Sequence, residues 1–448
     1  MLDSGIIYHG KTEKAKRRKR DARRARPLKR HLMKGNGKMG KLAINGGTPL
    51  LRPGEAKVTP WPPLSEKTEA RIIEVYRSRK WSFNSESERS FENAYSAFHD
   101  AKYGIVMSNG TVTLECALAA LGVGPGDEVI VPSLTWPATA MAVRYVGATI
   151  VFADIEPDTM CLDPKAFEAA ITPKTKAVIP VHLYGSMANL DEILAVADKH
   201  NIAVLEDCAH MQGGKWNGRG VGSWGRIGSF SFQQSKTLSG GESGICITND
   251  FELADLIYRL KHIGYSRNDA QGGAKTPPPA DLCCHNYRGL AIQAVIMEDQ
   301  IAGVPAYLEA CSKFAAAVEE ACKDIPGVAF QKPGLKATRQ GYYARGISFA
   351  GDMWRGIKAK HVAAALKAEG MTNLYTTYGL VRKHMLFNLS QKYWRNAGDP
   401  AAEAVCASTI VAMHMLMSAP GAAEQVVDAL HKLAANVNEL REYAKNQG

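Results

Sequence analysis

Residues 103–152 read YGIVMSNGTVTLECALAALGVGPGDEVIVPSLTWPATAMAVRYVGATIVF. Three short apolar runs predict strands, and the longer segments between them have the spacing of helices. The expected strands are Tyr103–Met107, Glu128–Val131 and Thr149–Phe152, and the expected helices are Val112–Leu121 and Ala138–Val146. Strands that alternate with helices favour a mostly parallel sheet covered by helices on both faces. After their first residues the strands are continuous apolar runs, as strands buried on both faces require.

The same alternation extends on both sides of this stretch. Further predicted strands are Ala177–Pro180, Ala203–Glu206, Ser229–Gln233 and Gly244–Thr248, and further helices are Ser65–Arg79, Phe91–Phe98, Pro164–Ala170, Leu190–His200 and Phe251–Ile263. A long helix from Leu290 to Cys322, broken near Gly303, begins a different pattern, with strands Val328–Gln331 and Tyr342–Phe349 and helices Ile357–Glu369, Ala401–Met415 and Ala422–Ala444. We therefore predict an α/β domain over residues 41–290 and a smaller C-terminal α+β domain over residues 291–448.

Composition excludes several classes of protein. The 448 residues are 46% hydrophobic and 22% charged, as in an ordinary globular protein. No run of 18 apolar residues predicts a membrane span. The nine cysteines lack the spacing of a zinc site, so we expect reduced thiols in a cytoplasmic protein and no bound metal.

The first 40 residues are the exception to this ordinary composition. Residues 1–41 hold 15 Lys and Arg against three acids, so their charge is +12. The rest of the chain carries −1, which gives the net charge of +11. We expect a disordered basic tail. It could be an arm for nucleic acid or a solvated extension, or Met39 could be the true start. We favour the last two readings, because the tail has no interleaved aromatic residues, and we expect no nucleic-acid partner.

Four short motifs follow successive predicted strands. Lys236 stands between a strand and a Gly-rich turn, Asp207 ends another strand, Trp136 follows PSLT, and Ser108–Thr111 lies between a strand and a helix. Each has an ordinary alternative: a surface lysine, a turn cap, a core tryptophan and a helix cap. Together they match what pyridoxal phosphate (PLP) requires, namely a lysine for its aldehyde, a carboxylate for its ring nitrogen, a flat ring and phosphate donors. Ligands also bind at this edge of an open α/β sheet.

From about Leu42 to Asn436 the chain resembles the DegT/StrS family of fold-type I PLP aminotransferases, whose large domain has a mostly parallel, seven-stranded-type sheet. The most specific stretches are Gly126–Trp136, Thr175–Asn189, Glu206–His210 and Ser231–Lys236. The resemblance implies that Lys236 forms the Schiff base with PLP and then transfers protons. It also implies the remaining cofactor contacts: Asp207 to the ring nitrogen, Trp136 to the ring face, His210 to the 3-oxygen, Gly110, Thr111 and Ser231 to the phosphate, and Asn286 to the phosphate from the partner subunit of a homodimer.

The branch that the motifs resemble most transfers an amino group from L-glutamine (or glutamate) to a keto-cyclitol such as a scyllo-inosose, in aminocyclitol or amino-sugar antibiotic biosynthesis. Alternatives are a nucleotide keto-sugar aminotransferase, an enzyme like 3-amino-5-hydroxybenzoate synthase, and a PLP-binding regulatory protein. A related dehydratase branch has histidine in place of the lysine, and Lys236 argues against that branch.

Several positions depart from the family pattern. Ser243 stands where the family has glycine, so we expect a strained positive φ there. Arg226 stands where aspartate is usual, and the segment Tyr378–His384, which contains Arg382, replaces one that lines the family's substrate site. His414 is close to the position of a C-terminal family histidine. These departures leave the identity of the ketone open.

Overall fold

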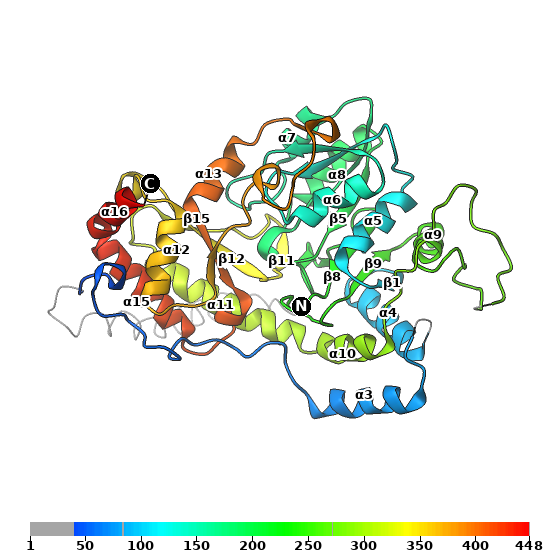
Figure 1. The fold of residues 1–448 in the computed structure, drawn as a ribbon, viewed down its shortest axis with the longest axis horizontal. Helices are drawn as coiled ribbons and strands as arrows, with labels where there is room; N and C mark the ends of the chain where they lie inside the picture. Colours follow the sequence, from blue (N-terminus) through cyan, green and yellow to red (C-terminus); the bar gives the residue numbers. More distant parts are fainter. Residues whose placement is uncertain (1–39, 83–84, 271, 448) are drawn as a thin grey trace, which may run out of the picture.

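A computed structural model describes residues 40–82, 85–270 and 272–447, and its largest element is an eight-stranded sheet (Figure 1). In spatial order the strands are β1 (Tyr103–Met107), β9 (Gly244–Thr248), β8 (Ile227–Ser231), β5 (Ala203–Asp207), β4 (Thr175–Val178), β2 (Glu128–Pro132), β3 (Thr149–Ala153) and β14 (Trp394–Asn396). Only β9 runs antiparallel to its neighbours. The predicted α/β fold with a mostly parallel sheet is confirmed.

Helices cover both faces of this sheet. They are α4 (Glu86–Phe98), α5 (Gly110–Ala120), α6 (Pro137–Tyr145), α7 (Pro164–Ala170), α8 (Leu190–Lys199), α9 (Phe251–Lys261) and α10 (Ala291–Ile301). Along β2, Val129 and Val131 pack in the core with α5, α6 and α9, whereas Ile130 packs in the core with α7 and α8. This alternation is the reason that the strand is apolar from Val129 to Pro132.

A second unit fills the left half of Figure 1, and the large sheet with its helices fills the right half. Its antiparallel sheet has the order β10 (Val328–Phe330), β12 (Ala344–Phe349), β15 (Thr409–Met413) and β13 (Leu374–Thr376). Its helices are α11 (Val304–Cys322), α12 (Ala359–Ala368), α13 (Pro400–Ser408), α14 (His414–Met417), α15 (Ala422–Ala435) and α16 (Val437–Asn446). Leu42 packs in the core of this unit, although it stands near the start of the described chain.

The remaining elements are one helix of 13 residues and several short segments. They are α3 (Glu66–Ser78), the 3₁₀ helices η1 (Ala43–Asn45), η2 (Leu183–Gly185), η3 (Asp352–Trp354), η4 (Val381–Lys383) and η5 (Gln391–Tyr393), and a small sheet of β11 (Ala337–Arg339), β6 (Lys215–Trp216) and β7 (Arg219–Gly220). Among the described residues no helix is long and apolar enough to cross a membrane.

The structure corrects the helix predicted over Ala401–Met415. A helix ends at Ser408, and Thr409–Met413 forms the fully buried strand β15, which pairs with both β12 and β13. The branched side chains of Thr409, Ile410 and Val411 favour a strand, and the Ala-rich sequence before them concealed the change of period. The break at Gly303 is confirmed, because α10 ends at Ile301 and α11 begins at Val304.

Two further differences concern the C-terminal part of the chain. The helix predicted over residues 422–444 is two helices that meet at Asn436. β14 extends the large sheet beside β3 although it lies far beyond that strand in the sequence, and three residues are too few to show a period. The domain boundary at residue 290 stays a prediction, and residues 1–39 of the expected tail lie outside the described part.

Candidate active site

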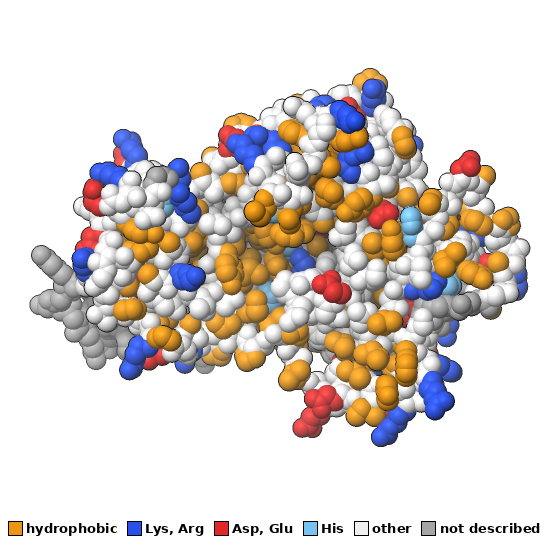
Figure 2. Space-filling model, viewed as in Figure 1, with side chains coloured by type: hydrophobic (Ala, Val, Ile, Leu, Met, Phe, Trp, Pro, Cys, Tyr) orange, Lys and Arg blue, Asp and Glu red, His pale blue; other side chains and the backbone are white. Residues whose placement is uncertain are grey.

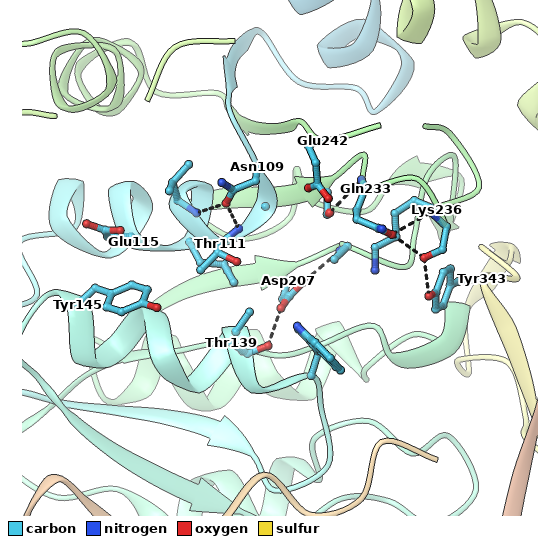
Figure 3. A pocket seen from close by; sticks show the side chains of 18 of the residues that line it. Asn109, Thr111, Glu115, Thr139, Tyr145, Asp207, Gln233, Lys236, Glu242 and Tyr343 are labelled. Atoms are coloured by element: carbon cyan, nitrogen blue, oxygen red, sulfur yellow. Dashed lines mark hydrogen bonds between the residues drawn. The ribbon is translucent and has the colours of Figure 1, made fainter. Parts of the chain in front are cut away.

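A pocket of about 900 Å³ opens at the carboxyl ends of the parallel strands. Hydrophobic side chains gather around a hollow near the centre of the face in Figure 2, and Figure 3 shows the pocket from close by. Six of the eight predicted site residues line it: Gly110, Thr111, Trp136, Asp207, Ser231 and Lys236. His210 lies behind the lining, and Asn286 is exposed on the surface.

The start of α5 forms one wall of this pocket. Asn109 caps the helix, and its Oδ1 accepts hydrogen bonds from the amides of Thr111 and Val112, both at 3.0 Å. A Cβ atom on Gly110 would lie 2.6 Å from the Cβ of Ser231, so only glycine lets the helix approach the end of β8 this closely. The positive end of a helix beside two hydroxyl side chains is a suitable site for a phosphate group.

Asp207 ends β5 on the floor of the pocket and is 4% exposed. Its Oδ2 accepts from Thr139 Oγ1 at 2.9 Å and its Oδ1 from the amide of Ala209 at 3.1 Å (Figure 3). Burial raises the pKa of this carboxyl group, and the two hydrogen bonds and the charge of Lys236 act against that rise. A buried carboxylate with only neutral hydrogen-bond donors can still attract a cationic ring N–H.

Lys236 projects from the loop between β8 and β9 and is partly exposed to the pocket. Its Nζ lies 4.5 Å from the centre of the Tyr343 ring. Burial lowers the pKa of Lys236, although Tyr343, Asp207 and Glu242 act in the opposite direction. A lysine with a lowered pKa is neutral in a larger fraction of molecules at neutral pH, and only the neutral amine is a nucleophile or a base.

The loop that carries Lys236 is held from behind by two rings. Trp61 Nε1 donates to the Lys236 carbonyl at 3.1 Å, and His414 Nε2 donates to the Ser235 carbonyl at 2.8 Å. His414 Nδ1 accepts from the Tyr307 hydroxyl at 2.6 Å. Burial lowers the pKa of His414 to about 4, so this histidine is a neutral support for the loop.

Trp136 caps the start of α6 and is 46% exposed in the pocket. The rings of Tyr378 and His384 meet it edge-on, with centroid distances of 5.3 and 5.8 Å. These two contacts fix the tilt of the indole and leave part of its surface to the pocket. A flat ligand ring could lie against that surface.

Comparison with known proteins identifies the family. The model of the DegT/DnrJ/EryC1/StrS aminotransferase family matches residues 62–431. The chain belongs to this family. It is therefore a PLP-dependent aminotransferase, and the resemblance of its motifs to the DegT/StrS family is confirmed.

Relatives and solved structures agree with this placement. The aminotransferase is 32% identical over 424 residues to an L-glutamine:2-deoxy-scyllo-inosose aminotransferase of Micromonospora echinospora, covering 90% of this chain and 100% of the relative. It is 36% identical over 340 residues to the enzyme of the same name from Streptoalloteichus tenebrarius, covering 73% and 78%.

Among solved structures, DesI in the presence of its TDP-sugar product superimposes with a TM-score of 0.78 at 26% identity, covering 91% of this chain and 98% of DesI. The 3-amino-5-hydroxybenzoic acid synthase superimposes with a TM-score of 0.75 at 25% identity, covering 86% and 99%.

Sequence reasoning missed several side chains that line the pocket of the aminotransferase. They are Glu115, Thr139, Tyr145, Gln233, Ser235, Glu242, Tyr287 and Tyr343. Tyr287 donates to Glu115 Oε1 at 3.2 Å, so these two residues form a polar wall near the start of α5. Tyr343 comes from the strand region of the second unit, and no local motif marks it.

The structure accounts for three departures from the family pattern. The positive φ expected at Ser243 is wrong: that residue is buried without a left-handed backbone, and its hydroxyl donates to the Met107 carbonyl at 3.1 Å. Arg226 forms an exposed ion pair with Asp250 at 3.1 Å. Arg382 binds both carboxylate oxygens of Asp399, at 2.6 and 2.9 Å. It therefore supports the loop that carries Tyr378 rather than lining the pocket itself.

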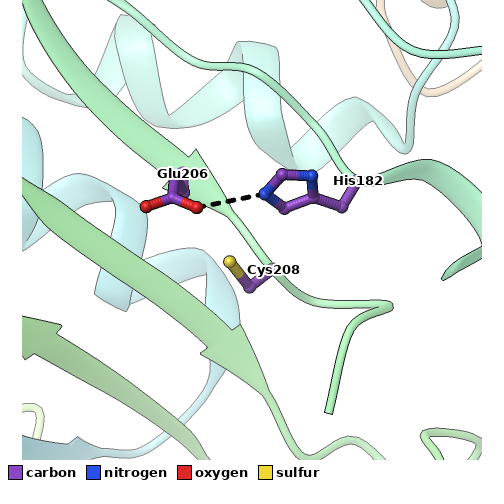
Figure 4. Close-up of side chains that lie close together, drawn as sticks. All are labelled: His182, Glu206 and Cys208. Carbon is purple, nitrogen blue, oxygen red and sulfur yellow. Dashed lines mark hydrogen bonds and ion pairs between the residues drawn. The ribbon is translucent and has the colours of Figure 1, made fainter. Parts of the chain in front are cut away.

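A second polar cluster lies next to Asp207 and is fully buried: His182, Glu206 and Cys208 (Figure 4). His182 Nδ1 accepts from the amide of Ala188, so Nε2 carries the proton and donates to Glu206 at 3.2 Å. Glu206 also accepts from three backbone amides, of Gly222, Trp224 and Gly225, at 2.7–2.8 Å. Burial acts to raise the pKa of Glu206, but these bonds outweigh it and lower that pKa. The bonds occupy the ligand atoms of His182 and Glu206, which makes the cluster structural rather than metal-binding.

Proposed function

We propose that this aminotransferase transfers an amino group from L-glutamine (or glutamate) to a keto-cyclitol such as a scyllo-inosose, using PLP held at Lys236. The observation that carries the proposal is that Lys236 and the buried Asp207 line one pocket in a chain whose relatives bear that activity in their names. We also infer a cytoplasmic location, because all nine cysteines are free thiols.

The residues of the pocket fit PLP. The start of α5 at Gly110 and Thr111 suits the phosphate, because the missing Cβ of Gly110 lets this helix end lie against Ser231, whose hydroxyl also lines the pocket. The Asp207 carboxylate suits a protonated ring nitrogen, and the exposed part of Trp136 suits the ring face. When bound, PLP supplies an aldehyde that carries the amino group between substrates and a ring that withdraws electrons from the reacting carbon.

Lys236 is the residue that carries the proton in the proposed transamination. Because burial favours its neutral form, Nζ can accept a proton from the amino donor and return it to the acceptor. Trp61 and His414 hold the backbone at this point of the loop, through the carbonyls of Lys236 and Ser235. The side chain of Lys236 can therefore move while its backbone stays in place.

The polar side chains of the pocket suit a ring that carries many hydroxyl groups. Gln233, Glu242, Glu115, Tyr145 and Tyr287 line it and offer both donors and acceptors. A ring with a hydroxyl group on most carbons can use such a wall, whereas an apolar ring would leave it unpaired.

The proposal also includes a homodimer with shared active sites. Asn286 is exposed and lies outside the pocket of its own chain, so it is free to reach the phosphate site of a partner. Mixing two inactive variants, Lys236→Ala and Asn286→Ala, tests this. If Asn286 acts in the partner's site, mixed dimers contain one intact site and activity returns. No recovery after subunit exchange contradicts the shared site.

The half-reaction with the amino donor tests the function itself. Purified protein is loaded with PLP and mixed with L-glutamine, and the absorbance change on conversion to pyridoxamine phosphate is followed. We expect conversion with glutamine or glutamate, no conversion in Lys236→Ala, and normal conversion in Lys332→Ala, whose lysine is exposed. If no amino acid converts the cofactor, the chain is a PLP-binding protein without this activity, as a regulator would be.

The acceptor is then identified with the aminated enzyme. 2-Deoxy-scyllo-inosose, its amino-bearing analogue, a nucleotide-linked keto-sugar and an aminoshikimate-type ketone are offered in turn. We expect turnover with a keto-cyclitol. Turnover with only the nucleotide-linked sugar or only the shikimate-type ketone would move the enzyme to another branch of its family.

A further inference from the structure

Hydrogen bonds behind the pocket link the Tyr184 amide, the His210 ring and the Tyr378 hydroxyl, and they determine which atom of His210 carries its proton. The amide of Tyr184 donates to His210 Nδ1 at 3.1 Å, so that nitrogen must accept. Neutral His210 then carries its proton on Nε2, which lies 3.2 Å from the Tyr378 hydroxyl oxygen. Burial and the charge of Lys236 lower the pKa of His210 well below its ordinary value, in agreement with the neutral form.

Tyr378 consequently accepts from His210, and its own hydroxyl proton goes to a different acceptor, which within the protein is the Tyr343 hydroxyl. Tyr378 lines the pocket and His210 does not, so an oxygen atom in the pocket meets the phenol first. The position of Tyr378 is fixed twice more: its amide donates to the Tyr184 hydroxyl at 2.9 Å, and its ring meets Trp136.

The hydroxyl of the neighbouring Tyr343 donates its proton to Ser235. Gln233 Oε1 accepts from the Ser235 amide at 2.8 Å and from the Ser235 hydroxyl at 2.7 Å. Because the Ser235 hydroxyl is used as a donor, the Tyr343 hydroxyl donates to it across 3.1 Å. The Tyr343 proton is thus committed to Ser235, and its oxygen accepts from Tyr378. Of these two phenols beside Lys236, Tyr378 is the one whose proton can turn from Tyr343 to a ligand oxygen in the pocket.

The origin of Tyr378 indicates which ligand it meets. It follows β13 in the second unit, whereas the residues that suit PLP come from the strand ends of the large sheet. It stands beside Trp136, the ring proposed to cover the cofactor, and so borders the space next to the cofactor.

We propose that Tyr378 is a specificity-determining residue for the acceptor: its hydroxyl donates a hydrogen bond to an oxygen of the keto-cyclitol ring, and His210 is the positioning residue that directs this bond. This inference rests on the proposed function. Burial raises the pKa of Tyr378 well above its ordinary value, so the phenol remains a donor throughout the neutral range.

The two half-reactions test Tyr378→Phe. We expect conversion of the cofactor by L-glutamine to stay within about twofold, and kcat/KM for 2-deoxy-scyllo-inosose to fall about tenfold, mainly through KM, as for one lost hydrogen bond. Tyr375→Phe is the control, because that tyrosine is 54% exposed in the strand just before. Equal slowing of both half-reactions would assign the hydroxyl to the cofactor, and no change would leave it without a role; either result overturns the proposal.

Variants of His210 test the positioning role. His210→Phe should lower kcat/KM for the acceptor by the same factor as Tyr378→Phe. The double variant should lower it no further, because both changes remove the same bond. His210→Gln should recover part of the loss, because its side-chain N–H can replace that of the histidine. Nitrogen-15 shifts of labelled histidine in the cofactor-free protein provide a readout that needs no catalysis. We expect the Nε2–H form for His210, and a charged or Nδ1–H ring at pH 7 overturns the relay. If wild type aminates nothing, the proposed function fails while this measurement still decides the relay.

Discussion

Replacing Glu206 with glutamine should strongly destabilise the protein although it changes one atom. Each carboxylate oxygen of Glu206 accepts two hydrogen bonds: Oε1 from the amides of Trp224 and Gly225, and Oε2 from Gly222 and His182. Whichever way the new amide turns, its NH₂ group faces two donors. A buried donor without a partner costs about 1–3 kcal/mol, so we expect a loss of about 3–5 kcal/mol.

Denaturation of the cofactor-free protein by urea measures this loss, with Glu168→Gln as the control. Glu168 is an exposed carboxylate, and its variant should unfold at the same urea concentration as wild type. The difference should depend on pH with a definite sign. Because the folded-state pKa of Glu206 is lowered, its contribution is present above the unfolded-state pKa and is lost as the pH falls through the folded-state pKa. A loss below about 1 kcal/mol at pH 7, or a difference that grows on acidification, would refute the reasoning.

Three further substitutions test other features. Gly110→Ala puts a Cβ 2.6 Å from that of Ser231 and should weaken PLP binding about tenfold or more in a fluorescence titration; an unchanged Kd contradicts the phosphate site. Arg382→Leu leaves buried Asp399 without its partner and should cost about 3 kcal/mol in urea denaturation, while an effect near zero would mean that the pair is not structural. Ser243→Gly should destabilise by about 1 kcal/mol through the lost hydroxyl bond, and stabilisation would restore the idea of backbone strain.

Local sequence was sufficient to predict which residues of the large sheet line the pocket. Asp207 and Lys236 stand in motifs beside apolar strands, and the carboxyl ends of parallel strands must meet at one edge of a sheet. Gly110 was likewise marked by its place between a strand and a helix. The alternation of predicted strands and helices was therefore enough to place Asp207, Lys236 and Gly110 at one edge of the sheet.

The side of the pocket that the second unit supplies depends on long-range contacts, and only the resemblance to the family pointed to the segment Tyr378–His384 there. Tyr343 and Tyr378 come from the second unit, far beyond Lys236 in the sequence, and only the meeting of the two units brings them to the pocket. His210 was expected at the cofactor, yet the structure places it behind Tyr378, because the amide of Tyr184 occupies one of its nitrogens. Its contact with the 3-oxygen stays a prediction.

The late arrival of β14 affects how the protein is made. β3 ends at Ala153, and its outer neighbour β14 begins at Trp394, after three strands of the second sheet have been synthesised. At about 5–20 residues per second, a ribosome needs roughly 12–50 s to translate that interval. During this time β3 has an open edge that can pair with another nascent chain. Correct production of the enzyme should therefore depend on dilution or on chaperones that shield this edge until translation passes residue 396.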